Sequence, residues 1–135
     1  MKLTLHGYKV LSCLILLPLA GCGAAQGIKS SQSTADQFLA KLQAGEIEDA
    51  YQLCSLGYRA GTKQEQLWNN WEVVQKNRGH MNGFALEAYH FSSGTHGRSI
   101  NLLYRLHCEH GESAARFVLL PEGERWLVES VIFDG

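Results

Sequence analysis

The stretch RSINLLYRLHCE, residues 98–109, decides the fold of this chain, because apolar and polar side chains alternate along it. Successive side chains of a β-strand point to opposite faces of a sheet, so the alternation predicts a strand with one buried face. The side chains predicted to be buried are Ile100, Leu102, Tyr104, Leu106 and Cys108. The opposite face carries Asn101, Arg105, His107 and Glu109, together with one apolar side chain, Leu103.

The same period of two recurs in four segments that follow Gly83. Turns that contain glycine separate these segments at 94–97, 110–112 and 122–124. Strands joined by such short turns pair with their neighbours in antiparallel fashion. The second half of the chain is therefore predicted to form a four-stranded antiparallel meander.

Apolar residues recur at helical spacing in the first half of the chain. Thr34 followed by Gln37 is typical of a capping box and predicts a helix that ends at Gly45. Further helices are predicted over 47–54 and over 62–79, where Trp71 lies on the apolar face. Helices followed by an antiparallel sheet predict an α+β fold, with the N-terminal helices packed on one face of a curved sheet.

This order of elements resembles the nuclear transport factor two-like, or cystatin-like, superfamily over residues 34–133. The resemblance rests on a few packing motifs, which are Leu42-Gln43-Ala44-Gly45, Ala50-Tyr51, the Trp-bearing helix and the hairpin Glu122-Gly123-Glu124-Arg125-Trp126-Leu127-Val128. It implies a cone-like sheet wrapped around the helices, whose interior holds a ligand, an active site or only a core. The aromatic residues expected to line such a cavity are Tyr51, Trp71, Tyr104 and Trp126.

Residues 1–21 have the features of a lipoprotein signal peptide. Lys2 and Lys9 supply a basic start, and the apolar stretch 10–20 is too short to span a bilayer. The following Leu19-Ala20-Gly21-Cys22 resembles the lipobox of bacterial lipoproteins, which implies that Cys22 carries acyl chains such as palmitate. In the lipoproteins of two-membrane bacteria that this segment resembles, Asp after the lipidated Cys favours retention at the inner membrane. Gly23 at that position therefore implies the periplasmic face of the outer membrane as the destination. An ordinary secretory signal that ends beside a cysteine is the alternative.

The composition divides the rest of the chain into two parts. Residues 22–33 are predicted to be the lipidated cysteine and a flexible tether, because Gly, Ala, Ser and Gln predominate there. Residues 34–135 are long enough for a single α+β domain.

Removal of residues 1–21 leaves ten basic and 13 acidic residues, a net charge of −3. This charge, without a basic stripe, argues against nucleic acid as a partner. The expected partners are the membrane, through the lipid anchor, and either a second copy of the chain or another protein of the cell envelope.

Cys54 and Cys108 are the cysteines that remain after processing and lipidation. Both are predicted on buried faces, by helical spacing and by strand alternation respectively. An even pair of cysteines in an exported protein predicts a disulfide. Two separately buried thiols are the alternative.

The run His107-Cys108-Glu109-His110 contains the ligand types that zinc or copper prefers. Strand alternation turns Cys108 away from His107 and Glu109, so no metal site and no other cofactor is expected. A catalytic site inside the cone would need a carboxylate or a histidine opposite a Tyr donor, and the pattern places neither there. No catalytic residue is therefore predicted.

An interaction surface is the remaining candidate. If Arg116 and Glu129 lie on the outer side of the last two strands, an apolar patch forms on that side. Its members are Leu103, Val118, Leu120, Leu127, Val131 and Phe133. A register error of one residue would move part of this patch inward. The sequence thus predicts a non-catalytic binding or scaffolding module, with a small-molecule-binding cone, in the form of an isomerase- or dehydratase-like enzyme, as the alternative.

Overall fold

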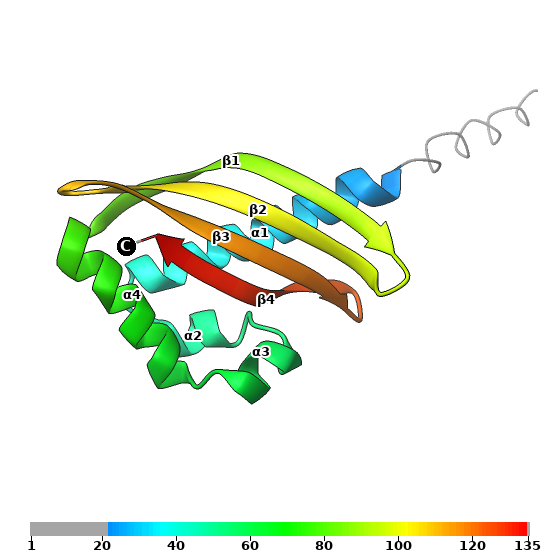
Figure 1. Ribbon diagram of the computed structural model, residues 1–135, viewed down its shortest axis with the longest axis horizontal. Coiled ribbons are helices and arrows are strands. Elements are labelled where there is room, and N and C mark those ends of the chain that lie inside the picture. The colour runs from blue at the N-terminus through cyan, green and yellow to red at the C-terminus, as the bar shows by residue number, and fades with distance from the viewer. Residues whose placement is uncertain (1–21, 135) are drawn as a thin grey trace, which may run out of the picture.

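The computed structural model describes residues 22–134, which form four helices followed by four strands. In chain order these are α1 (Cys22–Gln43), α2 (Ile47–Tyr51), α3 (Leu56–Gly61), α4 (Gln64–Arg78), β1 (Met81–Gly94), β2 (Gly97–Cys108), β3 (Gly111–Glu122) and β4 (Arg125–Asp134). The strands form an antiparallel sheet in the order β1-β2-β3-β4 (Figure 1). The predicted α+β class and the predicted meander are confirmed.

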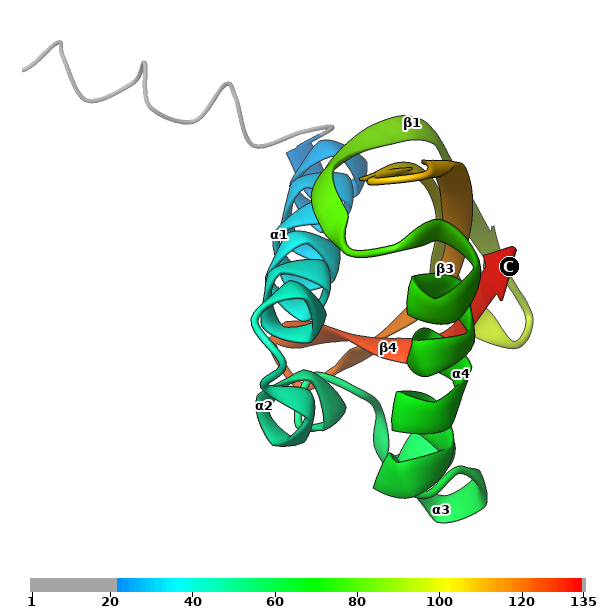
Figure 2. The same cartoon turned by 90° about the vertical axis from the view of Figure 1, so that its left-hand side faces the viewer.

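The helices lie on one side of the curved sheet. Helix α1 passes behind the sheet in Figure 1, and α2, α3 and α4 lie beyond β4. Figure 2 shows α1 and α4 apart from each other, and each of them contacts part of the curved, open sheet. We call the face toward the helices the inner face and the opposite one, which faces the viewer in Figure 1, the outer face.

The inner face forms the hydrophobic core. The five side chains of β2 that the alternation placed inside are all buried. Phe38 of α1 contacts Phe117 of β3 edge-on, with ring centroids 5.5 Å apart. Trp71 of α4 packs on Phe133 of β4 at 5.3 Å. Burial of each such large apolar side chain contributes about 1.5–3 kcal/mol, so these contacts hold the helices to the sheet.

Helix α1 begins earlier than the sequence indicates, and the prediction of a flexible tether over 22–33 is wrong for these residues. Gly27, Ser31 and Ala35, spaced by four residues, are buried against the sheet. Thr34, the predicted N-cap, lies within the helix and donates from Oγ1 to the carbonyl oxygen of Trp126 at 2.8 Å. The segment is helical, although its composition is typical of linkers, because its small residues pack closely against the sheet.

Strand β4 contains a bulge at Glu129. Val118 pairs with Ser130 and Leu119 with Val128, so Glu129 is an extra residue in the ladder. On the other edge of β4, Val128 exchanges backbone hydrogen bonds with the segment 53–55, at 2.8 and 2.9 Å. A bulge changes which side chains face the core, so the alternation after Glu129 is the reverse of the predicted one.

No helix within residues 22–134 combines the length and the apolar character needed to cross a bilayer.

Candidate functional site on the outer face of the sheet

Four of the six predicted interface residues lie on the outer face. Leu103 pairs with Arg116, whose side chain is exposed, and Leu120 pairs with Leu127. Val118 pairs with Ser130 on the same face. Leu127 is only 7% exposed, however, and therefore offers little surface to a partner.

The prediction is wrong for Val131 and Phe133. Val131 pairs with Phe117, which is buried in the core, and Phe133 pairs with the buried Ala115. Residues directly opposite in an antiparallel pair share a face, so both side chains point inward. The bulge at Glu129 causes this reversal, and it brings Ile132 to the outer face instead.

Ile132 completes a depression that we call the outer-face groove. The groove has a volume of about 540 Å³ and crosses all four strands. Its apolar lining includes Ala88, Leu103, Val118 and Ile132, and Ile132 is 58% exposed. His90, which pairs with Asn101 on the outer face, also lines it. An exposed apolar side chain beside a partly exposed apolar lining is typical of a binding surface, so the groove is the best-supported binding surface of the described residues.

A charged cluster lies beside the groove toward the β2–β3 turn, and we call it the Arg105 network. Arg105 donates to both carboxylate oxygens of Glu87, at 2.7 and 3.0 Å. It also donates to Glu112 at 2.8 Å, and Glu112 in turn contacts His107 Nδ1 at 2.9 Å. The guanidinium group is thus fixed by two carboxylates from the neighbouring strands.

These contacts shift the pKa values of two exposed groups. The hydrogen bond from Arg105 lowers the pKa of Glu112 below its usual value. The hydrogen bonds to Glu87 and then to Glu112 raise the pKa of Arg105 further. Both side chains therefore stay charged throughout the physiological range, and the network presents fixed charges to a partner.

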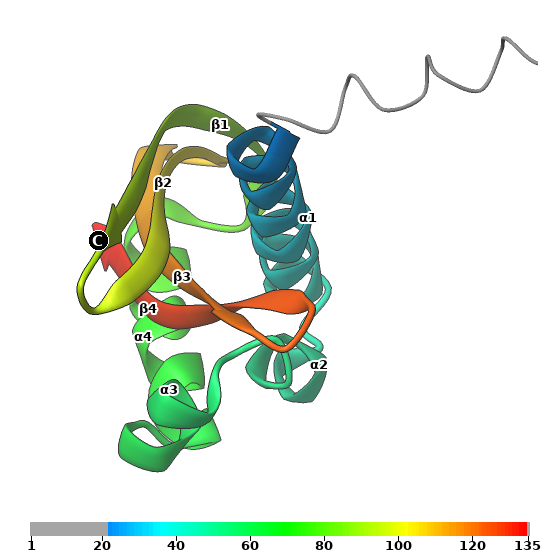
Figure 3. The same ribbon diagram turned by 90° about the vertical axis from the view of Figure 1, so that its right-hand side faces the viewer.

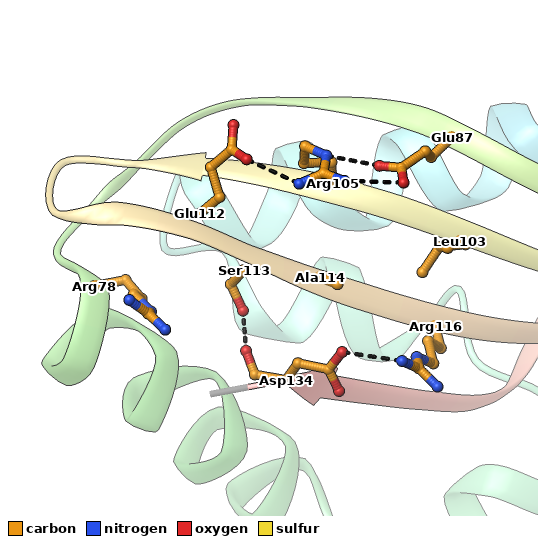
Figure 4. A pocket seen from close by; sticks show the side chains of 9 residues that line it. All are labelled: Arg78, Glu87, Leu103, Arg105, Glu112, Ser113, Ala114, Arg116 and Asp134. Carbon is orange, nitrogen blue, oxygen red and sulfur yellow. Dashed lines mark hydrogen bonds and ion pairs between the residues drawn. The ribbon is translucent and has the colours of Figure 1, made fainter.

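The Arg105 network borders a second depression of about 420 Å³ (Figure 4). In Figure 4 Arg105 lies between Glu87 and Glu112, while Arg116 approaches Asp134 on the last strand. The Arg116 and Asp134 side chains are 3.3 Å apart. Arg78 at the end of α4 lines the same depression, so positive and negative side chains alternate around it.

The four predicted cavity-lining aromatics do not converge on one cavity. Trp71 contacts Phe133, and Tyr104 contacts both Phe84 and Phe117. Tyr51 donates from its hydroxyl to the carbonyl oxygens of Arg59 and Thr62 at the end of α3. Trp126 packs against Gly27 and lies under the guanidinium of Arg98, 5.4 Å from the ring centre. All four side chains belong to the hydrophobic core or pack against it.

Sequence reasoning missed Asp36, which accepts a hydrogen bond from the Tyr104 hydroxyl at 2.6 Å. Burial of the phenol, followed by its bond to Asp36, raises the pKa of Tyr104 above its usual value. The Tyr104 ring is fully buried between aromatic neighbours, so the pair ties α1 to β2. No local pattern in the sequence signals this pair, because Asp36 and Tyr104 lie 68 residues apart. The backbone carbonyl oxygen of Gln32 also accepts from the Tyr104 hydroxyl.

The predicted disulfide is not formed, and both Cys54 and Cys108 are buried free thiols. Cys54 lies beside the middle of β4, where its backbone forms an isolated β-bridge with Val128. Cys108 lies at the end of β2, opposite Met81 and Gly111. The two periodicity arguments were right about burial, but they could not establish that the two side chains lie on the same part of the sheet.

The alternation through His107, Cys108 and Glu109 is confirmed, since Cys108 is buried and its neighbours are exposed. Glu109 accepts a hydrogen bond from the backbone of His80 at 2.8 Å. Within residues 22–134 no three His, Cys, Asp or Glu side chains gather in a way that would hold a metal ion.

The predicted lipidation site, Cys22, is the first residue of α1. The signal peptide over residues 1–21 lies outside the described residues.

Comparison with known proteins supports the fold alone. No protein-family model matches the chain, and no curated protein is similar to it in sequence. A solved structure from Catenulispora acidiphila is similar to it, with a TM-score of 0.58 at 11% sequence identity, over 83% of this chain and 93% of that one. This likeness shows the fold, in which helices pack on a four-stranded antiparallel sheet, and it assigns no family to the chain.

Proposed function

We propose that this protein is a lipid-anchored protein of the bacterial cell envelope whose domain is a non-catalytic binding module. The observation that carries the proposal is the outer-face groove, an open apolar surface on the side of the sheet away from the helices. The resemblance of Leu19-Ala20-Gly21-Cys22 to a lipobox supports the anchor and a periplasm-facing position at the outer membrane.

The outer face has the two components of a specific protein interface. The exposed Ile132 and the half-buried Val118 provide apolar area that a partner removes from water. The neighbouring Arg105 network provides fixed charges, which set orientation more than affinity.

A second copy of the chain is the partner that this surface fits best. Arg105 and Arg116 lie beside Glu87, Glu112 and Asp134, so the face carries both signs of charge. In a two-fold interface each patch meets its own copy, which requires such self-complementarity. Another envelope protein is the alternative partner.

Sedimentation of the mature chain carrying Cys22→Ser tests the association. We expect a dimer at micromolar concentration, and we expect Ile132→Glu to weaken it at least tenfold because a carboxylate would be buried in the groove. Leu56→Glu is the matched control, since Leu56 is 69% exposed but lies on α3, outside the groove. A monomer at high concentration would leave a heterologous partner, which crosslinking from position 118 in cells would capture. If the protein formed no dimer and gave no crosslink, the proposal would be contradicted.

Substitution of Cys22 tests the anchor. We expect Cys22→Ser to abolish incorporation of labelled palmitate and to release the protein from the membrane fraction. Membrane binding that persists in this variant would show a different attachment.

The small-molecule-binding cone is less well supported. The pairing of Asp36 with Tyr104 is the observation in its favour, because a carboxylate and a phenol are the groups that isomerase or dehydratase chemistry uses. The two groups are bonded to each other, however, and Tyr104 is enclosed by Phe84 and Phe117. The same site therefore supports packing better than catalysis.

A further inference from the structure

A lipid carried by Cys22 would lie very close to the folded domain. Cys22 begins α1, and only five residues later Gly27 packs against the Trp126 ring. At about 1.5 Å per helical residue, this segment spans about 7.5 Å. Even a fully unwound first turn would reach only about 17 Å. The anchor therefore restrains the orientation of the domain, which a long flexible tether would not.

We propose that one end of the domain rests on the lipid surface, namely the end formed by the start of α1, the β1–β2 turn and the β3–β4 turn. This inference rests on the proposed lipid anchor and goes beyond it by naming the membrane-facing surface. Figures 1 and 3 show the three parts gathered at one end of the long axis. Ile100 follows the β1–β2 turn and Trp126 follows the β3–β4 turn. Gly27 of α1 lies against both residues, so the three parts are in contact.

The side chains at this end of the domain are compatible with contact to a lipid headgroup layer. The exposed basic residues Lys29, Arg98 and Arg125 lie on its three parts. Arg98 covers the Trp126 ring, and such long cationic side chains can reach phosphates while their stems pack on apolar atoms. Glu122 and Glu124 carry the opposite charge nearby. The short anchor, rather than net charge, therefore determines the orientation.

The orientation has a consequence for the binding surface. The strands run from this end to the opposite end, where the β2–β3 turn and the end of α4 lie (Figure 1). The outer face then stands at the side of the domain, and the Arg105 network lies farthest from the bilayer. Both the groove and the network remain accessible to a partner while the protein is anchored.

Lipid quenching on the full lipidated protein tests the orientation. The protein is reconstituted in vesicles of phosphatidylethanolamine and phosphatidylglycerol, with a fluorophore on Thr95→Cys, Glu124→Cys or His110→Cys. The first two positions lie in the turns at the proposed membrane end, and His110 lies in the β2–β3 turn. We expect headgroup-level quenching by nitroxide lipids to be at least threefold stronger at positions 95 and 124. Equal quenching at all three positions in protein that floats with the vesicles would overturn the inference.

A spacer variant separates the anchor from the surface. Ten Gly and Ser residues inserted between Ala25 and Gln26 extend the reach by about 18 Å. We expect this variant to float with vesicles but to lose the quenching difference, and an unchanged difference would overturn the role of the short anchor. Protein that does not float at all, with or without the spacer, would instead contradict the proposed lipid anchor.

Discussion

At the scale of single residues, Gly27 decides how closely α1 approaches the sheet. A Cβ at this position would lie 3.2 Å from the Trp126 ring and 3.5 Å from Ile100. Any larger side chain would have to displace the helix or the indole, since cores pack without spare volume. The glycine that made this stretch look like a linker is therefore a packing residue.

We expect Gly27→Leu to destabilise the domain by about 1–3 kcal/mol, because overpacking forces the helix from the sheet. Urea denaturation followed by tryptophan fluorescence measures this change. Gly61→Leu is the matched control, because Gly61 also lies in a helix but a Cβ there meets no neighbour within 4 Å. Equal effects of the two substitutions would contradict the close packing at Gly27.

The two cysteines give a second prediction at this scale. Burial raises the pKa of Cys54 to about 12 from 9.0, and Arg59 offsets the shift only in part. At pH 8 the folded protein then holds about a thousandfold less Cys54 thiolate than an unfolded chain does. We expect iodoacetamide to modify two thiols rapidly in urea and to leave Cys54 unmodified without it. If mass spectrometry without reductant found no free thiol in urea, the protein would contain the predicted disulfide.

At the scale of elements, Ser55 couples α3 to the bulge in β4. Its Oγ accepts from the Tyr58 backbone at 3.0 Å as the N-cap of α3, and it donates to the Glu129 carboxylate. Its backbone nitrogen donates to Val128. One residue thus helps to hold the extra residue of the bulge, and with it the face on which Ile132 lies.

We expect Ser55→Ala to cost about 2 kcal/mol, since it removes an N-cap and a hydrogen bond to a half-buried charge. Chemical denaturation measures the loss. Ser93→Ala on the exposed end of β1 serves as the control and should change stability by less than about 0.5 kcal/mol. Glu129→Gln should cost less than Ser55→Ala, because an amide oxygen still accepts from the hydroxyl.

The elements also show what the sequence could predict. The inner face of β2 and the outer position of Leu103 follow from local alternation, and the structure has both. The start of α1 depends on Trp126, and the face of Ile132 depends on the segment 53–55, which pairs with β4. Such contacts join distant parts of the chain, so no local period contains them. The groove was therefore only partly predictable.

At the scale of the whole molecule, the buried ionisable groups couple stability to alkaline pH. Burial, with smaller effects of Cys54 and Tyr51, raises the pKa of Tyr58 to about 12 from 10.0. The pKa of Cys54 is raised in the same direction. Above about pH 9 the unfolded chain therefore releases protons that the folded domain retains. Since deprotonation favours the unfolded state, stability is complete below pH 9 and is lost as the pH approaches 12.

We expect the urea midpoint to fall by about 1 M between pH 9 and pH 11, while it changes little between pH 7 and pH 9. Tyr58→Phe removes one of the responsible groups, so it should make the alkaline fall shallower whatever its effect at neutral pH. Tyr89→Phe is the matched control, because Tyr89 is 60% exposed and its removal should leave the slope unchanged. If both variants gave the wild-type slope, the alkaline loss of stability would have to come from groups other than Tyr58.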